Sequence, residues 1–503
     1  MLRGEYGSVD INTKYLPILV NQKIVERTFE LAREKNPNFP LLAVVTGTKP
    51  DFYKQAPLIM EAAKAGFPAF VIDTGQHHDE ILGHGIREFG MEEMVACNLQ
   101  IRGTLMEKAS ELLLKFASFG KICKNNYPHN PILPIVHGDT LVAGITPLSW
   151  LFGMGQKVAQ NEAGLRSMAP RAVKGLSLEE PSQVQIEEFV NSQMEEVLWF
   201  IARDEPFPEQ VDTWICSAGT HYFFAPTQVN AQNLIREGYP EENIYVVGNS
   251  VVDAIDIKRK AKPDSSIFDL YPALNTHGSN STGRASTLVR DEWIRVDIHR
   301  RENLTKFRFL NIIEAVVRLV ETGYKVVLIR LTATEHALKA YGLVDRLNQL
   351  AKDFPDRFIQ TPLWKDYGHV IEFLDSGSCW LELTDSGSMQ EELLYFPNVI
   401  SITVRLNTDR PETIFDARDN ILAPPLHPRW ITELVNFANQ GRLPSSHSSS
   451  NKKQIYGEPG SVSTRILEII KKHFEEGSTF YPWLHDRLGI DTGRHSRDEV
   501  GYL

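Results

Sequence analysis

The sequence predicts an α/β protein that contains two successive parallel β-sheets. Three observations lead to this prediction. The chain has 503 residues, enough for roughly three domains of average size or for two domains with appended segments. Hydrophobic residues make up 42% of the chain and charged residues 23%, so it can bury a sizeable core and is not mainly disordered. Short apolar runs alternate with segments of helical spacing, and this alternation favours parallel sheets.

The first half of the chain begins with a predicted helix and continues with four predicted strands. Residues 23–35 place Val25, Phe29 and Ala32 at helical spacing, so we expect an N-terminal extension that packs on a domain. Residues 41–45 form a partly β-branched run that ends in a polar turn, and helical spacing resumes over residues 56–65. Further strands are predicted at residues 70–72, 132–136 and 244–247, each followed by Asp, His or Gly and then by a helical pattern.

The second half of the chain repeats this order after a polar segment. Residues 275–287 are rich in turn-forming residues, so we expect a mobile loop and no strand there. A helix over residues 463–474 could cross back to the first half, whereas residues 477–503 have no clear period. The strands of the second half are predicted at residues 294–298, 326–331, 379–383 and 399–404.

Charge and cysteine content exclude several classes of protein. Lys and Arg number 53 and Asp and Glu number 64, which gives a net charge of −11, so we expect neither nucleic acid nor a membrane surface as a partner. No apolar run reaches the roughly 18 residues of a membrane span. The N-terminus lacks the pattern of a signal peptide, and we therefore expect a soluble, cytoplasmic protein. The four cysteines form no CxxC pair, which indicates neither a zinc site nor a disulfide framework.

Polar clusters at the ends of the predicted strands are the first candidates for a ligand site, because open parallel sheets bind ligands there. In the first half, the segment Thr46 to Pro50 offers backbone N–H groups and the Lys49 ammonium to a phosphate, although a solvated turn fits equally well. Asp139 follows the predicted strand at 132–136 and could serve as a base, a metal ligand or a helix cap. Glu162 and Glu209 add two more carboxylates, each of which alone could be a surface acid.

The second half offers cations and a loop of small residues. His299 and Arg300 follow the predicted strand at 294–298 and suit an anionic leaving group, although a solvated basic turn would have the same sequence. The segment 384–392 carries small residues that let backbone N–H groups approach a phosphate. Glu392 lies one turn further along and could bind a ribose diol or remain a solvated acid, and Arg410 adds a cation before a proline.

Taken together, these segments resemble the UDP-N-acetylglucosamine 2-epimerases over approximately residues 41–472. The resemblance lies in the order of many short motifs, most of them at predicted strand ends. They read TGTKPDFYKQAP, DTGQHH, VHGDT, NEAGLR, FPEQ, GNSVVDA, IHRRE, TDSGSMQEE and RPE, followed by a YG-containing turn and a helix.

The resemblance implies an α/β fold of two Rossmann-like domains of the glycosyltransferase-B type, with the active site in the cleft between them. We expect an N-terminal domain over residues 1–254 with an insertion at 167–207, and a UDP-binding domain over residues 255–460. Residues 461–503 would form the helix that returns to the N-terminal domain, and a tail. The family also implies a UDP-sugar substrate, no metal, no other cofactor and a homodimer.

The resemblance also implies roles for individual residues. In the family, UDP is eliminated to give a 2-acetamidoglucal and is then re-added with inverted configuration at C-2. Asp139, Glu162 and Glu209 would be the acid and base carboxylates, and His299 would contact the leaving diphosphate. Which carboxylate takes the proton stays open. The residues that would bind the substrate are Lys49, Lys54, Gln76, His77, Arg166, Arg300, Ser386, Gly387, Ser388, Glu392 and Arg410, with Ser386 and Gly387 on phosphate and Glu392 on the ribose.

Several positions depart from the family pattern. Lys49 stands where the family has Arg, and Lys cannot reproduce a planar bidentate grip on phosphate. Asp212 and Thr213 stand where the family has Asn-Arg, so a cation of the substrate pocket is missing. Ser388 replaces a second Gly of the phosphate loop. The remaining departures are Asp51, Gln210, the segment 330–332 and the insertion at 167–207, which could be a lid, an oligomer contact, a specificity element or an inert excursion.

The leading prediction is therefore a 2-epimerase that interconverts UDP-N-acetylglucosamine and UDP-N-acetylmannosamine. A hydrolysing enzyme that releases N-acetylmannosamine and UDP would use the same elimination, followed by addition of water. Gln76-His77 resembles a pair that belongs to an allosteric substrate site in non-hydrolysing members, which favours re-addition. A glycosyltransferase or a catalytically inactive sugar-nucleotide sensor could be built on the same scaffold, because a fold alone does not fix chemistry.

Overall fold

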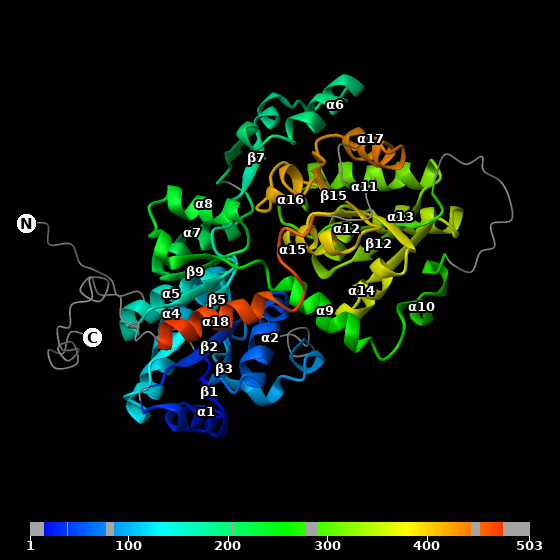
Figure 1. The fold of residues 1–503 in the computed structure, drawn as a ribbon. Coiled ribbons are helices and arrows are strands. Elements are labelled where there is room, and N and C mark those ends of the chain that lie inside the picture. The colour runs from blue at the N-terminus through cyan, green and yellow to red at the C-terminus, as the bar shows by residue number, and fades with distance from the viewer. Residues whose placement is uncertain are drawn as a thin grey trace, which may run out of the picture.

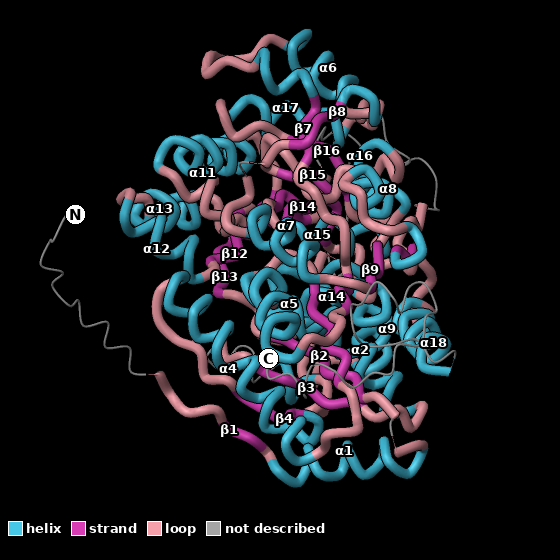
Figure 2. The backbone as a smooth tube through the Cα atoms, turned by 90° about the vertical axis from the view of Figure 1, so that its left-hand side faces the viewer, coloured by secondary structure: helices cyan, strands magenta, loops and turns pink. Residues whose placement is uncertain are grey.

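The computed structural model describes residues 15–37, 39–76, 85–203, 205–276, 290–443 and 453–475. They form two α/β halves, each built on a parallel sheet, and the two sheets lie in separate parts of the molecule (Figures 1 and 2). In these residues no helix is both long enough and apolar enough to span a membrane. The predicted mobile loop lies outside the described residues beyond Thr276, and the predicted aperiodic tail lies outside them entirely.

The first sheet has eight strands in the order β1-β4-β3-β2-β5-β6-β9-β10. All neighbours are parallel except β1, which pairs antiparallel with β4 and so ties the N-terminal extension to the sheet. The strands are β1 (Leu19–Val20), β2 (Leu41–Thr46), β3 (Ala69–Asp73), β4 (Val95–Asn98), β5 (Ile132–His137), β6 (Ala159–Asn161), β9 (Tyr222–Ala225) and β10 (Ile244–Val246).

Helices cover both faces of this sheet because its central strands are apolar on both sides. Along β2, Leu41, Ala43 and Val45 pack on one face with α1, α4 and α5, whereas Leu42 and Val44 pack on the other with α2, α9 and α18. The helices of this half are α1 (Gln22–Lys35), α2 (Lys49–Lys64), α4 (Leu105–Asn126), α5 (Leu141–Met154), α7 (Glu209–Gly219), α8 (Gln228–Arg236) and α9 (Val251–Ala261).

The second sheet has six parallel strands in the order β13-β12-β11-β14-β15-β16. One face packs on α11, α13 and α17, and the other on α14 and α9, so the apolar cluster under α9 continues from one half into the other. The strands are β11 (Trp293–Asp297), β12 (Lys325–Arg330), β13 (Phe358–Pro362), β14 (Cys379–Thr384), β15 (Ile400–Thr403) and β16 (Asn420–Leu422).

Along the chain, the helices of the second half mostly alternate with its strands. They are α10 (Ile267–Leu270), α11 (Lys306–Glu321), α12 (Thr332–Ala340), α13 (Val344–Asp353), α14 (Tyr367–Asp375), α15 (Gly387–Glu392), α16 (Glu412–Phe415) and α17 (Pro428–Asn439). Short 3₁₀ turns occur throughout the described chain, at η1 (Glu92–Met94), η2 (Arg171–Gly175), η3 (Glu196–Leu198), η4 (Glu241–Asn243), η5 (Pro272–Leu274) and η6 (Leu393–Tyr395).

The segment predicted as an insertion leaves the first half after Arg166 and docks on the second. Its strands β7 (Met168–Pro170) and β8 (Trp199–Ile201) form an antiparallel pair, and its helix α6 (Gln183–Ser192) lies beside α17. Met168 exchanges two backbone hydrogen bonds with Thr408, of 2.7 and 2.8 Å. The Gln193 side-chain amide bonds both backbone groups of Leu422, at 2.7 and 3.3 Å, and so pairs the edge of β16. The insertion is therefore a strap that joins the two halves.

The last described helix, α18 (Val462–Glu475), lies against the first half and packs on α2 and α9 (Figure 1). The Asp253 carboxylate accepts hydrogen bonds from the backbone N–H groups of Gly460 and Ser463, both at 2.7 Å, and so caps the start of α18. Asp253 belongs to α9, which contacts both α2 and α14. The predicted domain boundary after Ala254 falls within α9 and stays a prediction.

The strands predicted from the sequence agree with the structure to within one or two residues, but one helix start was wrong. The helix predicted at 56–65 begins at Lys49, because Thr48 caps it by accepting the Asp51 N–H group at 3.3 Å. Pro50 lies in the first turn, where its missing N–H group costs nothing. The expected loop around Lys49 and Pro50 is thus the first turn of a helix.

Candidate active site between the two sheets

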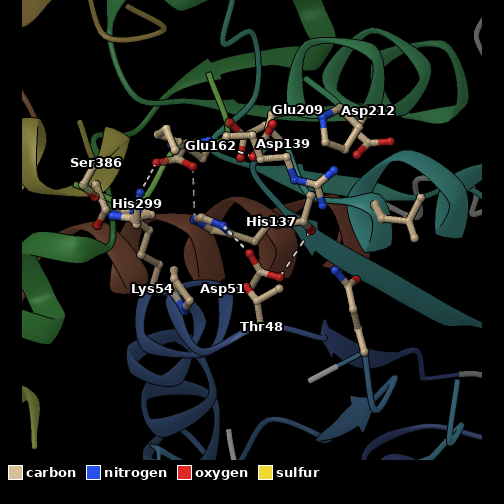
Figure 3. A pocket seen from close by; sticks show the side chains of 18 of the residues that line it. Thr48, Asp51, Lys54, His137, Asp139, Glu162, Glu209, Asp212, His299 and Ser386 are labelled. Carbon is tan, nitrogen blue, oxygen red and sulfur yellow. Dashed lines mark hydrogen bonds and ion pairs between the residues drawn. The ribbon is translucent and has the colours of Figure 1, made fainter. Parts of the chain in front are cut away.

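A cavity of about 400 Å³ lies where the carboxyl ends of the strands of the two sheets face each other (Figure 3). Both halves of the chain line it, as expected for a cleft site. The lining residues are Thr48, Pro50, Asp51, Lys54, Gln76, Leu105, His137, Asp139, Thr140, Leu141, Glu162, Pro208, Glu209 and Asp212 from the first half, and His299, Arg300, Arg301, Ser386, Ser388 and Arg410 from the second.

Carboxylates dominate the wall that the first half provides. Asp139 follows β5, Glu162 follows β6 with a left-handed backbone (φ 61°), and Glu209 and Asp212 lie in the first turn of α7. Because β5 and β6 are parallel neighbours, their carboxyl ends bring Asp139 and Glu162 to the same edge of the sheet. The motifs VHGDT and NEAGLR, which carry these two residues, thus meet at one edge of the sheet.

Cations and hydroxyl groups dominate the opposite wall. His299 and Arg300 follow β11, and their backbone N–H groups donate to the Asp385 carboxylate at 3.0 Å each. Ser386 follows β14, the parallel neighbour of β11. Arg300 donates to Glu209 of the other wall at 2.7 Å, so the two walls are in direct contact at this point.

A buried network of charges joins the two halves at the floor of the cavity. Lys54 donates to Glu162 of its own half and to Glu391 of the other half, the latter at 2.6 Å. Arg410 lies 3.3 Å from Glu162 and 3.1 Å from Glu391, and it pairs with its neighbour Asp409. Asn249 donates to Glu162 at 2.7 Å and to Glu391 at 2.9 Å. Each acidic side chain in this network therefore contacts Lys54, Arg410 or both.

The carboxyl groups of the cavity have different proton affinities because their partners differ. Burial alone would raise the pKa of Glu162, but Lys54 and Arg410 hold it well below its ordinary value. Burial raises the pKa of Asp139 to about 7, against the opposing effect of Arg410. Burial, with Asp139 and Glu209 nearby, raises the pKa of Asp212 to about 8. The site therefore holds one fixed anion beside carboxyl groups that exchange protons near neutral pH.

His299 is held by two acidic neighbours. Its Nδ1 lies 3.0 Å from Asp297 and 3.4 Å from Asp385. Burial lowers the pKa of the imidazole, but Asp297 and Asp385 outweigh burial and raise it above its ordinary value. The two carboxylates thus favour the cationic form of the ring, which lines the cavity.

Several polar atoms at the cavity make no hydrogen bond within the part of the chain that the structure describes. They are Gln76 Oε1, both ring nitrogens of His137, Asp139 Oδ2, Glu209 Oε2, Asp212 Oδ2 and Arg300 Nε. Buried polar groups normally have partners. Donors and acceptors gathered in this way around one cavity are typical of a polar ligand site. Among the described residues, no group of three or more His, Cys, Asp or Glu side chains is arranged to hold a metal ion.

Ten of the predicted site residues line the cavity. They are Lys54, Gln76, Asp139, Glu162, Glu209, His299, Arg300, Ser386, Ser388 and Arg410. Gly387 lies next to them, where a Cβ atom would come within 3.2–3.3 Å of the guanidinium groups of Arg410 and Arg300. Glycine at this position therefore lets both cations approach the loop. His77 lies outside the described residues.

Lys49, Arg166 and Glu392 do not line the cavity. The Lys49 ammonium donates to the Lys365 carbonyl at 2.6 Å, between the two halves. Arg166 is fully buried behind the carboxylate wall, where it forms two hydrogen bonds with Glu237 of 2.6 and 2.7 Å. The Glu392 carboxylate bonds the side chains of Tyr367 and Ser388. In this arrangement none of these three side chains reaches the cavity. Their contacts with a substrate therefore stay predictions.

Single motifs in the sequence did not reveal several residues of the site. His137 lies between Asp51 (3.7 Å) and Glu162 (3.6 Å), and Asp212 completes the carboxylate wall. Asn249 and Glu391 complete the charge network. His137, Asn249 and Glu391 belong to the motifs VHGDT, GNSVVDA and TDSGSMQEE, so their membership of these motifs was the available signal.

Comparisons with known proteins identify the family of the chain. The family model described as UDP-N-acetylglucosamine 2-epimerase matches residues 201–471, which is more than half of the chain. The chain belongs to this family. The epimerase-family chain is 27% identical over 438 residues to the UDP-N-acetylglucosamine 2-epimerase of Methanocaldococcus jannaschii, with 85% of this chain and 98% of the relative aligned. It is 24% identical over 435 residues to the Salmonella typhimurium protein of that name, again with 85% and 98% aligned.

Solved structures of similar proteins share the fold. A crystal structure of the Methanocaldococcus jannaschii protein in complex with UDP-GlcNAc and UDP matches with a TM-score of 0.63 and 25% identity, over 86% of this chain and 99% of that one. A Neisseria meningitidis structure bound to UDP-GlcNAc matches with a TM-score of 0.62 and 21% identity, over 86% and 100%. The epimerase-family chain thus has the predicted α/β fold of two Rossmann-like domains of the glycosyltransferase-B type.

Proposed function

We propose that this protein is a sugar-nucleotide 2-epimerase that interconverts UDP-N-acetylglucosamine and UDP-N-acetylmannosamine by elimination and re-addition of UDP. One observation carries the proposal. In a single cavity, carboxyl groups that can exchange a proton face cations that can stabilise a leaving diphosphate. Family membership and the relatives crystallised with UDP-GlcNAc support the choice of substrate.

Asp139 is the carboxyl group best suited to move the C-2 proton. Its pKa of about 7 lets it accept a proton near neutral pH, and its Oδ2 makes no hydrogen bond within the described residues. Glu162 has a low pKa and four partners in the network, so it would hold the cations in place and stay ionised. Glu209 would orient Arg300 across the cavity.

The elimination needs charge stabilisation on the opposite wall. When the base takes the C-2 proton, the electrons of the C–H bond form the C-1 to C-2 double bond, and the C-1 to oxygen bond breaks with its electrons on UDP. The negative charge that develops on the diphosphate would be stabilised by His299, Arg300 and the hydroxyl groups of Ser386 and Ser388. Re-addition of UDP at C-1 together with delivery of a proton to the opposite face of C-2 completes the epimerisation, and Asp212, whose pKa of about 8 keeps it protonated near neutral pH, lines the cavity and could supply that proton.

The proposal also includes a homodimer. The packed helices α4 and α5 expose the large apolar side chains Met106 (76% exposed), Leu114 (56%) and Phe152 (68%). Apolar surface of this kind is typical of a face that a partner covers, and a second copy of the chain is the proposed partner. Cytoplasmic location and action without a metal or nicotinamide remain predictions from the sequence.

Proton NMR of the protein with UDP-N-acetylglucosamine in deuterated water tests the reaction. We expect deuterium at C-2 together with the signals of UDP-N-acetylmannosamine. Free N-acetylmannosamine and UDP would instead identify a hydrolysing enzyme. Absence of any exchange at C-2 would contradict the proposal.

Replacing Asp139 tests its role in proton transfer. Asp139→Asn keeps the shape but cannot accept the C-2 proton, so we expect the exchange rate at C-2 to fall by about 10²–10⁴-fold, with UDP affinity nearly unchanged. Asp256→Asn is the matched control, since Asp256 pairs with Lys260 on the surface. Exchange at the normal rate in Asp139→Asn would assign the proton to another group.

A further inference from the structure

Three charged side chains lie behind His299 on a buried face of the second sheet. Arg295 and Asp297 are two positions apart on β11, so both side chains point to the same face of the sheet. Glu382 lies opposite Arg295 on the neighbouring strand β14. All three side chains are buried, and none of them lines the cavity. No step of the proposed reaction uses them.

These side chains form a series of contacts that ends at His299. Glu382 contacts one terminal nitrogen of the Arg295 guanidinium, and the other terminal nitrogen lies 3.7 Å from Oδ2 of Asp297. The second oxygen of Asp297, Oδ1, lies 3.0 Å from Nδ1 of His299. The Asp297 carboxylate therefore lies between a guanidinium and an imidazole, and the imidazole lines the cavity.

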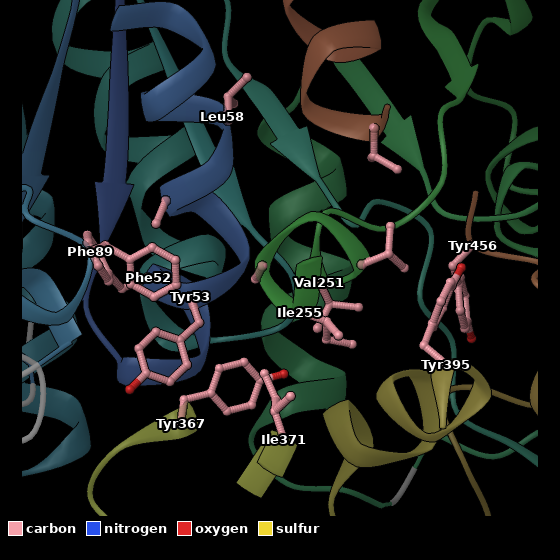
Figure 4. Close-up of a cluster of buried hydrophobic side chains, with 14 of the residues drawn as sticks. Phe52, Tyr53, Leu58, Phe89, Val251, Ile255, Tyr367, Ile371, Tyr395 and Tyr456 are labelled. Carbon is pink, nitrogen blue, oxygen red and sulfur yellow. The ribbon is translucent and has the colours of Figure 1, made fainter. Parts of the chain in front are cut away.

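The surroundings of Arg295 are apolar. Its guanidinium lies over the ring of Trp364, 5.3 Å from the ring centroid, and its Nε makes no hydrogen bond within the described residues. Trp364 belongs to the apolar cluster that continues between the two halves, and Figure 4 shows the part of this cluster around the stacked rings of Tyr53 and Tyr367. Since water is largely excluded from this face, the charges of Arg295 and Asp297 act on each other with little screening.

Two carboxylates and one further cation act on the His299 ring at close range. Asp385 lies 3.4 Å from Nδ1, and it also accepts the backbone N–H groups of His299 and Arg300. The neighbouring Arg300 guanidinium disfavours the cationic form of the ring. Asp297 is thus one of two carboxylates at Nδ1, and it also contacts Arg295.

Charged groups on the other elements around His299 have partners or line the cavity. On β12, which is the other neighbour of β11, Arg330 pairs with Glu335 at 2.5 Å. The charged groups that line the cavity together with His299 include Lys54, Asp139, Glu162, Glu209 and Arg410. The variants described below leave all of these groups in place, so a change in His299 can be assigned to the groups behind it.

We propose that Asp297 and Arg295 are positioning residues that set the charge with which His299 meets the leaving diphosphate. The inference rests on the proposed function, because the diphosphate belongs to the proposed substrate. Asp297 accepts the hydrogen of Nδ1, and the other ring nitrogen, Nε2, is left to donate to the ligand. Arg295 contacts the second oxygen of Asp297 and weakens the attraction of this carboxylate for the charged ring. The charge of His299 is therefore adjusted by groups that do not contact the ligand.

The pKa of the His299 ring measures this effect directly. NMR of the full chain with isotope-labelled histidine follows the signals of the 15 imidazoles with pH, and the signal missing from His299→Gln identifies His299. Asp297→Asn removes the negative charge 3.0 Å from Nδ1, so we expect the pKa of His299 to fall by about 1–3. Arg295→Met removes the cation that competes for Asp297, so we expect the pKa of His299 to rise by about 0.5 or more.

The opposite signs of the two shifts distinguish the inference from a purely structural role. A general loss of packing would move the pKa of the ring in both variants towards that of a solvated histidine. Two shifts of the same sign, or the absence of either shift, would overturn the inference.

Arg259→Met is the matched control for Arg295→Met. Arg259 also pairs with a carboxylate, that of Asp375 at 2.8 Å, and its guanidinium also lies over an aromatic ring, that of Phe396. None of these three residues lines the cavity. We expect the pKa of His299 to stay unchanged in this control, and a rise as large as in Arg295→Met would contradict the inference.

A double variant protects the test against misfolding. Arg295→Met leaves Glu382 buried without its cation, which is costly, whereas Arg295→Met combined with Glu382→Gln leaves no unpaired charge. Burial raises the pKa of Glu382 to about 8 against the effect of Arg295, so the pair contributes more positive than negative charge at neutral pH. We therefore expect the double variant to raise the pKa of His299 as well, by less than the single variant. A folded double variant in which this pKa falls or stays the same would contradict the inference.

The affinity for UDP provides the functional readout. Isothermal titration calorimetry between about pH 7 and 10 avoids the titration of a phosphate group itself at about pH 6. The affinity should fall as the pH rises through the pKa of His299, because the ring loses its positive charge. We expect this fall at lower pH in Asp297→Asn and at higher pH in Arg295→Met than in the unmodified protein. A fall at the same pH in all three proteins would overturn the inference.

The two readouts separate this inference from the proposed function. Failure of the unmodified protein to bind UDP would refute the proposed function, and the NMR titration would still decide whether Asp297 and Arg295 set the charge of His299. UDP binding without exchange at C-2 would refute only the proposed reaction.

Discussion

Asp212 is a buried carboxyl group (3% exposed) whose Oδ2 makes no hydrogen bond within the described part of the chain. It lies one turn after Glu209 on α7, and burial together with Asp139 and Glu209 raises its pKa from 3.8 to about 8. An acid whose pKa is higher in the folded state keeps its proton while the unfolded chain loses it. The free energy of unfolding therefore falls as pH rises between about 4 and 8.

Replacing Asp212 with asparagine removes this pH-dependent decrease in the free energy of unfolding. Asp212→Asn has nearly the same shape but no proton to lose, so its stability relative to the unmodified protein should increase with pH. We expect the difference in the free energy of unfolding to be larger at pH 8 than at pH 5 by about 1–3 kcal/mol. Urea unfolding at the two pH values measures it, and a difference that does not change with pH would contradict the assignment.

At the scale of residues, the sequence predicted where the site lies better than what each side chain touches. Asp139, Glu162, His299 and Ser386 follow strands directly, and strand ends converge in any parallel sheet, so their position could be predicted. Lys49 could not be placed in this way. Its direction depends on Thr48 starting α2 early and on the Lys365 carbonyl, which comes from the other half of the chain.

At the scale of elements, the strap over residues 167–207 is the part that most exceeds the sequence prediction. Its length marked it as an insertion, but its place on the second half depends on contacts far apart in sequence. Glu205 forms two hydrogen bonds with Arg308, of 2.9 and 3.0 Å. The ring of Phe189 packs edge-on against Trp430, with the ring centroids 5.3 Å apart. Neither contact produces a pattern in the neighbouring sequence from which it could be predicted.

Truncating Phe189 tests how much this docking contributes to stability. Phe189 is 2% exposed, so Phe189→Ala should lower the free energy of unfolding by about 3–5 kcal/mol. Val184→Ala on the same helix is the control, because Val184 is 62% exposed and should change stability little. Chemical denaturation measures both. Equal stability of the two variants would mean that α6 is not held on the second half in solution.

At the scale of the whole molecule, the alternation of strands and helices predicted two parallel sheets, and the described residues form two large sheets with mostly parallel strands, besides the small antiparallel pair β7–β8 of the strap. The order of strands within each sheet was not predicted, because pairing such as β2 with β5 skips over β3 and β4. The strands β4, β6, β9, β13 and β16 also escaped prediction, since runs of three to five residues carry too little periodicity.

The proposed homodimer concerns the whole molecule. Charged side chains placed on its proposed interface should separate the two copies. Leu114→Glu together with Phe152→Glu places two carboxylates on the exposed face of α4 and α5. Both side chains are exposed, so the fold should survive and the dimer should dissociate. Light scattering coupled to size exclusion reports the mass. Unchanged mass in the double variant would move the interface elsewhere, and a monomeric unmodified protein would remove the homodimer proposal.

The return of α18 to the first half sets an order of events during synthesis. Ile466, Leu467 and Ile470 complete the apolar cluster against which α2 and α9 pack, yet they are made more than two hundred residues after Ala254. At ribosomal speeds of 5–20 residues per second, this gap lasts roughly 10–45 seconds. During that time the first half has its sheet but lacks its last helix. A nascent chain paused before residue 462 therefore presents an apolar surface to chaperones, and only completion of the chain removes it.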